Sequence, residues 1–245
     1  MAERPKIVPL ATCLHDKGGV RRCADCRVRL VSVCSVLDSS ELQEIESIGE
    51  ENQYVPRQAL THEGEAAESV FSITEGVVRV VRHLEDGKRQ ILGFALPSDF
   101  LGLSLTDNYR FTAEAITPAK ACKFSRVKFA SFADKYPHVV RRLYEMAGYE
   151  LTLAREQLVL VGRLSADQRL AAFLISISNR LRRLGYTSPS IPLPMSRRDI
   201  ADYLGLTIET VSRAFTRLAK SKLIVSTPDG VRLLKETELQ ILGKH

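Results

Sequence analysis

The segment 196–220 constrains the fold of this chain more than any other. Ser196 is followed three residues later by Asp199, a pair whose side chains can bond the backbone N–H groups left free at a helix start. Gly205 suits the positive φ of a tight turn. Thr207 can cap a second helix that runs to about Lys220. The segment therefore predicts two short helices joined by a tight turn, a helix-turn-helix.

The predicted second helix has two different faces. Its apolar residues recur at spacings of 3, 4 and 3 and are expected to pack on the first helix. They are Ile208, Val211, Phe215 and Leu218. A polar set, Glu209, Ser212, Arg213 and Thr216, follows another face. A hairpin over residues 224–233, turning at Asp229-Gly230, completes the pattern of a winged helix-turn-helix.

The polar face has the chemistry for reading DNA, because residues near the start of such a helix reach base edges in the major groove. Arg can donate two hydrogen bonds to guanine, Glu can accept one from a cytosine amino group, and Ser can do either. The expected base readers are Glu209, Ser212 and Arg213, and the expected phosphate ligands are Arg197, Arg198, Arg217 and Lys220. The alternative is that Glu209 and Arg213 only pair with each other on a solvated face.

Positive charge is concentrated in the same part of the chain. From Arg163 onward there are 14 Lys and Arg against 7 Asp and Glu, whereas residues 1–162 hold 21 against 22. A localised basic excess favours a polyanion as partner, here double-stranded DNA. No apolar run is long enough to cross a bilayer and residues 1–9 carry no secretion signal, so we expect no membrane association and a cytoplasmic location.

Residues 37–134 have mostly a β pattern. Three β-branched runs, 70–73, 77–84 and 90–96, are separated by the turn pairs Glu75-Gly76 and Asp86-Gly87. A small sandwich or β-roll is the natural closure of such strands.

A long helix is predicted over 135–162. Apolar residues recur there at alternating spacings of 4 and 3, namely Val140, Tyr144, Ala147, Leu151, Ala154, Leu158 and Val161. This spacing is typical of a coiled-coil seam and predicts a homodimer. The alternative is a helix that packs only on its own domain. A further helix over 166–184, opened by Ser165, carries the apolar stripe Leu170, Phe173, Leu174 and Ile177, and residues 185–194 are expected to form a loop.

Four of the five cysteines lie between Cys13 and Cys34. In a reducing cytoplasm this clustering favours metal or redox chemistry over structural disulfides. Four thiols can complete either a tetrahedral zinc site or the four corners of an iron–sulfur cluster. The candidates are Cys23, Cys26 and Cys34, with Cys122 from a predicted strand. The spacing of these cysteines distinguishes poorly between the two kinds of centre. A dithiol enzyme needs a βαβ context around the C-x2-C pair. None is visible, so we expect no enzymatic activity.

The segment from Met195 to Phe215, MSRRDIADYLGLTIETVSRAF, resembles the DNA-binding motif of the CRP/FNR superfamily. The resemblance implies an α+β chain with an N-terminal β-roll, a long dimerisation helix and a C-terminal winged helix-turn-helix. It divides the chain into a cysteine-bearing segment 1–36, a β-roll 37–134, a dimerisation helix 135–162 and a DNA-binding domain 163–245. The Glu-x-x-Ser-Arg pattern from Glu209 to Arg213 is similar to the FNR and FixK branches, whose sites resemble TTGAT-N4-ATCAA.

The FNR resemblance implies an oxygen-labile [4Fe-4S] cluster held by Cys23, Cys26, Cys34 and Cys122, with Cys13 as the spare thiol. The spacing of the cysteines leaves open the alternative that Cys13 replaces one of these four ligands. It also implies a regulator that is mainly an activator in low oxygen and that contacts RNA polymerase through the hairpin 84–89. The alternatives for this site are structural zinc or thiol-redox chemistry. For Cys122 alone, the alternative is a small buried core residue.

The superfamily's cyclic-nucleotide receptors need a carboxylate for the ribose and an arginine for the phosphate. Here the corresponding stretch, 100–105, has no acidic residue after Gly102, and Arg110 is misplaced relative to Ala113. We therefore expect no cyclic nucleotide as ligand.

Overall fold

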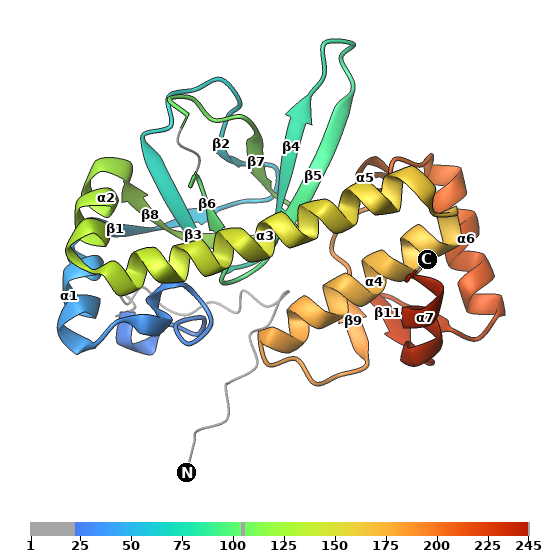
Figure 1. Ribbon diagram of the computed structural model, residues 1–245. Helices are drawn as coiled ribbons and strands as arrows, with labels where there is room; N and C mark the ends of the chain where they lie inside the picture. The colour runs from blue at the N-terminus through green and yellow to red at the C-terminus, as the bar shows by residue number, and fades with distance from the viewer. Residues whose placement is uncertain (1–22, 104–105, 245) are drawn as a thin grey trace. The chain divides into compact units, whose positions relative to one another are not determined.

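The computed structural model describes residues 23–103 and 106–244 and divides into two compact units, Met1–Gly148 and Tyr149–His245. One helix, α3 (Pro137–Arg163), begins in the first unit and ends in the second (Figure 1). Among the described residues, no helix is both long and apolar enough to cross a membrane.

The first unit is built on two four-stranded antiparallel sheets with strand orders β1-β8-β3-β6 and β2-β7-β4-β5. The strands are β1 (Gly49–Tyr54), β2 (Ala59–Thr61), β3 (Ser69–Glu75), β4 (Val78–His83), β5 (Arg89–Ala95), β6 (Phe100–Leu101), β7 (Thr112–Ala115) and β8 (Ala119–Ser125). Apolar side chains of both sheets share one core that includes Phe71, Ile73, Val78 and Ala113. The predicted β-roll is confirmed, and β3, β4 and β5 correspond to the three expected runs.

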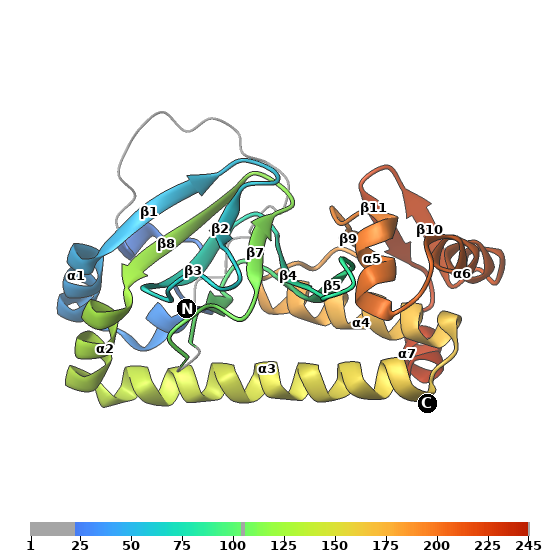
Figure 2. The same ribbon diagram turned by 90° about the horizontal axis from the view of Figure 1, so that it is seen from above.

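Short helices close one end of the roll. η1 (Cys23–Asp25) and η2 (Val33–Val36) are 3-10 turns, while α1 (Ser39–Ile48) and α2 (Arg126–Lys135) lie side by side (Figures 1 and 2). α1 begins with a capping box, because Asp38 accepts from the backbone N–H of Glu41 and the Glu41 carboxylate accepts from that of Asp38. The β pattern assigned to this region did not predict α1.

α3 has two apolar faces. It starts at Pro137, a residue favoured at the first helical position, and the expected range 135–162 is correct to within two residues. Val139, Leu143 and Met146 pack on the core of the first unit. The residues of the predicted seam are instead exposed, Tyr144 at 81% and Leu158 at 75%.

The second unit contains the predicted helix-turn-helix. Its elements are α4 (Ala166–Arg183), β9 (Ser190–Pro192), α5 (Arg197–Leu204), α6 (Ile208–Lys220), β10 (Ile224–Thr227), β11 (Gly230–Leu233) and α7 (Glu236–Leu242). The predicted stripe of α4 is buried, with Leu170, Phe173, Leu174 and Ile177 all at most 4% exposed. Ser165 caps this helix through a box with Gln168. These elements agree with the fold class expected from the sequence.

The loop predicted over 185–194 is wrong in one place, because it contains β9. This strand pairs antiparallel with β11, so the wing has three strands in the order β10-β11-β9. β9 is short and ends at Pro192, which lacks a backbone N–H, and both features hide a strand from pattern analysis. The hairpin turning at Asp229-Gly230 is confirmed.

A glycine allows β9 to approach. A Cβ atom on Gly230 would lie 2.1 Å from the carbonyl oxygen of Ile191. We expect Gly230→Ala to lower the free energy of unfolding by about 1–3 kcal/mol, because the backbone of β9 must move away. Gly93→Ala is the control, since a Cβ there meets nothing within 4 Å. Chemical denaturation measures both, and equal losses of stability would contradict this account of the wing.

Candidate DNA-binding surface and cysteine cluster

Local hydrogen bonds fix the starts of both helices of the helix-turn-helix, α5 and α6. Ser196 Oγ accepts from the backbone N–H of Asp199 at 3.1 Å, and Asp199 Oδ2 accepts from that of Ser196 at 3.0 Å. Gly205 follows α5 with φ of 62°, the left-handed conformation expected for the turn. Thr207 Oγ1 then accepts from the backbone N–H of Thr210 at 3.2 Å. Both predicted caps and the turn glycine are confirmed.

The two faces of α6 are separated largely as predicted. Val211, Phe215 and Leu218 are buried, but Ile208 is 42% exposed, so its assignment to the packed face is wrong. Because Cα–Cβ bonds tilt towards a helix N-terminus, the side chain of the first residue points past the end of the helix. Ala214 is buried in the packed face instead.

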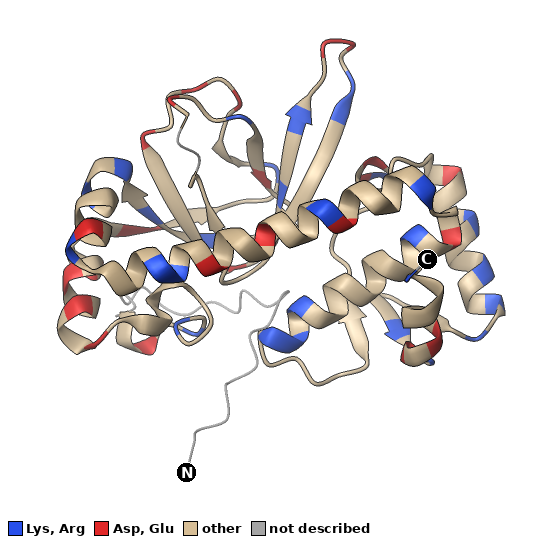
Figure 3. Cartoon of the chain, viewed as in Figure 1, with Lys and Arg blue, Asp and Glu red and all other residues tan. Residues whose placement is uncertain are grey.

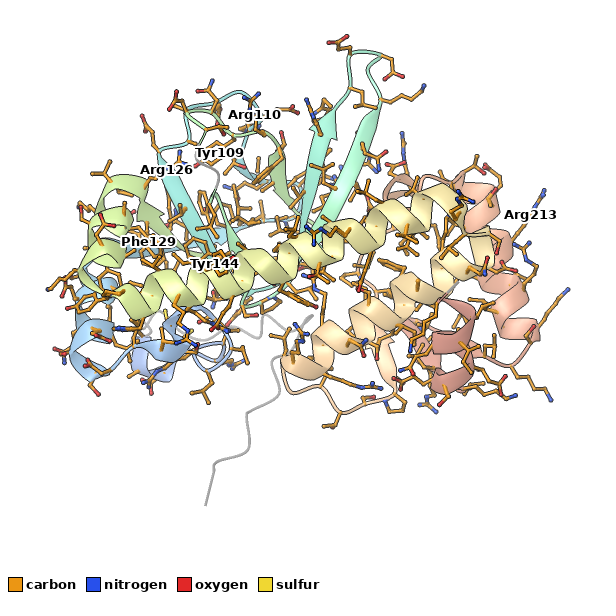
Figure 4. The ribbon with its side chains drawn as sticks, in the orientation of Figure 1. Tyr109, Arg110, Arg126, Phe129, Tyr144 and Arg213 are labelled. Atoms are coloured by element: carbon orange, nitrogen blue, oxygen red, sulfur yellow. The ribbon has the colours of Figure 1, made fainter. Side chains whose placement is uncertain are left out.

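The three predicted base readers share the exposed surface of α6. Glu209, Ser212 and Arg213 are all exposed, and Figure 4 shows Arg213 reaching away from the helix. Ser212 Oγ donates to the carbonyl oxygen of Ile208 at 2.8 Å, which leaves its lone pairs available. The pKa of Glu209 is lowered, first by its own backbone N–H, then by the Thr207 side chain, and Arg213 adds a smaller effect. Glu209 is therefore an ionised acceptor.

The alternative, a Glu209–Arg213 pair on a solvated face, lacks a direct contact. Within residues 23–103 and 106–244, no ion pair closer than 4.0 Å joins these two side chains. Their exposed positions near the start of α6 leave both groups available to a ligand in the groove.

Two of the four predicted phosphate ligands contact side chains of the same unit. Arg198 and Lys220 are exposed, and Figure 3 shows further Lys and Arg along α6. Arg217 instead pairs with Asp167 at 2.6 Å. The Arg197 guanidinium lies 3.1 Å from the centre of the Phe215 ring, and burial lowers its pKa. Arg197 thus stacks between α5 and α6, a cation–π contact that spacing alone does not reveal.

Three of the four cysteines come from distant parts of the first unit and pack on one core. Cys23 lies in η1, Cys26 follows it, Cys34 lies in η2, and Cys122 lies in β8, the strand expected for it. Cys23, Cys34 and Cys122 pack against the same apolar cluster, which includes Val33. All four side chains are of intermediate exposure.

The thiols influence one another's titration. Burial raises the pKa of Cys23 to about 11 and that of Cys34 to about 12, and it raises the pKa of Cys122 as well. Repulsion from the neighbouring cysteines adds to these shifts; for Cys122 it comes from Cys26, Cys23 and Cys34. Such thiols stay protonated unless a cationic centre stabilises their thiolates. In the described part of the chain, no three His, Cys, Asp or Glu side chains converge closely enough to hold a single metal ion.

Tyr109 and Arg110 follow the stretch that corresponds to the cyclic-nucleotide cassette in sequence. Tyr109 is 6% exposed and belongs to the core of the roll. Its hydroxyl donates to the carbonyl oxygen of Ser69 at 2.7 Å and accepts from the Ser69 N–H at 3.1 Å. The neighbouring Arg110 is exposed (Figure 4).

Comparison with known proteins agrees with this arrangement. Residues 168–242 match the Crp-like helix-turn-helix domain and residues 51–136 the cyclic nucleotide-binding domain. The chain is 45% identical over 235 residues to the transcriptional activatory protein AadR of Rhodopseudomonas palustris, covering 96% of this chain and 97% of that protein. It is 44% identical to the nitrogen fixation regulation protein FixK of Bradyrhizobium diazoefficiens, covering 90% of this chain and 93% of that protein.

Among solved structures, FixK2 from Bradyrhizobium japonicum superimposes with a TM-score of 0.75 at 36% identity, covering 81% of this chain and 98% of that chain. These matches extend over both units and include the β-roll, α3 and the winged helix-turn-helix. The chain belongs to the CRP/FNR family of transcription regulators.

Proposed function

We propose that this regulator is an FNR/FixK-type activator that binds DNA as a homodimer while four cysteines hold a [4Fe-4S] cluster. Oxygen removes the cluster and weakens the dimer. One observation carries the proposal: Cys23, Cys34 and Cys122 pack on the same core as Val139, Leu143 and Met146 of α3. A change at the thiols can therefore act on the helix that carries the predicted dimer seam.

The proposed DNA site is a TTGAT-N4-ATCAA-like palindrome. A two-fold dimer presents two recognition helices to two half-sites, so its symmetry matches a palindrome. Support comes from the exposed Glu209, Ser212 and Arg213, and from relatives whose names describe activators, including the transcriptional activator protein FnrL of Cereibacter sphaeroides. The exposed Ile208 can add an apolar contact to a thymine methyl group.

The cluster ligands in this proposal are Cys23, Cys26, Cys34 and Cys122. Cys13, which lies outside the described residues, is the spare thiol. When bound, the cluster supplies iron centres whose positive charge stabilises the four thiolates. Oxygen can oxidise and dismantle such a cluster. The chain's own contribution is to pack Cys23, Cys34 and Cys122 on one apolar core and to shield the thiols partly from water.

Two further parts of the proposal concern partners of the β-roll. We propose that the β4–β5 hairpin contacts RNA polymerase; it extends beyond its sheet in Figure 1, and Leu84 at its end is 44% exposed. We also propose that the roll binds no cyclic nucleotide. Tyr109 belongs to the core of the roll, and the neighbouring Arg110 is exposed.

The identity of the centre is tested by anaerobic reconstitution with iron and sulfide, followed by ultraviolet–visible and Mössbauer spectroscopy. A [4Fe-4S] signature with acid-labile sulfide supports the proposal. A colourless protein with one tightly bound zinc ion would show that the site holds a structural metal ion instead of a cluster. A metal-free protein whose cysteines are oxidised reversibly would show that the regulator works by thiol-redox control instead of a cluster.

Arg213→Ala is expected to weaken binding to the palindrome by about 1–3 kcal/mol and to relax preference at one guanine of each half-site. The reason is loss of a two-pronged hydrogen bond to a base. Lys220→Ala is the control, since loss of a phosphate contact weakens all sequences alike and lowers the salt dependence. Titrations against single-base variants of the site separate the two results. If Arg213→Ala weakened binding to all sequences equally, Arg213 would be assigned to a phosphate contact instead of a base contact.

A further inference from the structure

One arginine of α3 reaches directly into the cysteine segment. Arg142 Nη2 donates to the carbonyl oxygen of Val31 at 2.8 Å, and its Nε donates to that of Ser32 at 3.4 Å. The side chain is 25% exposed, and Nη1 lies 3.3 Å from Glu145 Oε2. The two bonds to carbonyl groups lie within the first unit and join residues 111 and 110 positions apart in the sequence.

The two carbonyl groups belong to the turn that positions Cys34. Ser32 is 1% exposed, and its Oγ accepts from the Cys34 N–H at 3.2 Å. The Ser32 carbonyl also accepts from the Ser35 N–H at 3.2 Å, so it belongs to the 3-10 turn that carries Cys34. A displacement of Arg142 therefore moves the backbone on which this thiol is held.

The same turn of α3 faces two ways. Val139 and Leu143 pack towards the core that the thiols share, and Arg142 lies between them in sequence. Val140 and Tyr144 of the predicted seam are 48% and 81% exposed. A helix turn held on one side by the cysteine segment thus presents its other side to a partner.

We propose that Arg142 is a positioning residue that couples the cysteine segment to the dimer helix. It rests on the proposed function, because it assigns to one side chain the link between cluster occupancy and dimerisation. A centre that orders the cysteine segment favours the helix position in which both carbonyl groups reach the guanidinium. Coupling of this kind requires a contact whose strength differs between the two states, and in this proposal the Arg142 hydrogen bonds are that contact.

Arginine suits this role better than lysine. Its planar fork presents several N–H groups at fixed angles, so it can hold two carbonyl groups and a carboxylate at once. A lysine ammonium keeps the charge but lacks the fork. Arg142→Lys should therefore recover only part of the coupling.

The neighbouring arginine offers a matched control. The Arg141 side chain is 85% exposed, and its Nε lies 3.7 Å from Glu145 Oε1. Arg141→Gln and Arg142→Gln remove the same charge from the same helix turn, and both disturb Glu145. Only the second removes the bonds to Val31 and Ser32.

The first arm of the test needs no cluster. Hydrogen exchange is measured on the cofactor-free full chain, for peptides covering residues 28–37. We expect Arg142→Gln to speed exchange there about tenfold, since hydrogen bonds to a charged group are lost, and Arg141→Gln to leave it unchanged. Exchange in β3 reports whether each variant is folded. If Arg142→Gln does not fold, Arg142→Lys is measured in its place. Equal exchange in 28–37 for wild type and the Arg142 variants would overturn the proposal.

The second arm measures the dimer dissociation constant by sedimentation, before and after anaerobic reconstitution with iron and sulfide. We expect reconstitution to strengthen the wild-type and Arg141→Gln dimers at least about tenfold, and the Arg142→Gln dimer by less than about threefold at equal iron content. Full coupling in Arg142→Gln would refute the assignment. If reconstitution leaves the wild-type dimer unchanged, the proposed function itself fails, while the exchange arm still decides whether Arg142 holds the segment.

Discussion

Cys122→Ser is expected to abolish the bound iron and sulfide and to weaken binding to the palindrome by at least about tenfold. Cys122 sits in the middle of β8, paired with Glu51 of β1 and Ser72 of β3, so the sheet fixes its backbone. Its thiol is partly exposed and sits on the core that Cys23 and Cys34 contact. A hydroxyl in its place is a poor ligand for iron. The measurements are iron and sulfide analysis, and a DNA titration under argon.

The matched control for this change is Cys13→Ser, which also removes one thiol from the N-terminal half of the chain. It should keep the wild-type iron content. If Cys122 is only a core residue, Cys122→Ser lowers thermal stability but leaves iron and DNA affinity unchanged. Loss of iron in Cys13→Ser, with iron retained in another single-cysteine variant, would instead reassign one of the four ligands.

Tyr144→Asp is expected to break the dimer, raising its dissociation constant by about a hundredfold or more. Tyr144 is 81% exposed on α3 of a single chain and belongs to the apolar seam (Figure 4). Pairing of two such helices would bury one aspartate from each chain without a partner, which costs about 3 kcal/mol or more. Affinity for the palindrome then falls towards that for a single half-site. Sedimentation and titration with full and half sites measure both effects.

Val127→Asp is the control for added charge. Val127 is 77% exposed on α2 and lies off the seam, so its replacement should leave the dimer intact. The opposing view is that α3 packs only within its own chain. Under that view, Tyr144→Asp changes neither the dimer nor DNA binding.

The parts of the fold that could be predicted from sequence are those governed by local rules. Caps at Ser196 and Thr207 and the positive φ of Gly205 depend on neighbouring backbone groups, so the sequence predicts the helix-turn-helix with nearly correct boundaries. Alternating burial in a strand is equally local. β9 depends on pairing with a strand some forty residues away and has only three residues, so no local pattern predicts it.

The site was predictable to a smaller extent. The spacing of Cys23, Cys26 and Cys34 marked a candidate centre, but only the pairing of β8 with β1 and β3 brings Cys122 to it. Nothing in the sequence distinguishes Arg142 from an ordinary solvated helix residue such as Arg141. Its bonds to two backbone carbonyl groups exist only after the cysteine segment folds onto α3. Contacts between side chains and distant backbone groups produce no periodic pattern in the sequence.

The most direct test of the account follows one anaerobic sample of reconstituted wild-type protein as air is admitted, recording the cluster absorbance, the sedimentation coefficient and binding to the palindrome together. We predict that the absorbance is lost first, and that the dimer and the DNA complex then dissociate in proportion to it. A dimer that persists on DNA after the cluster absorbance has disappeared would contradict the central claim that the occupied thiol centre holds the two chains together.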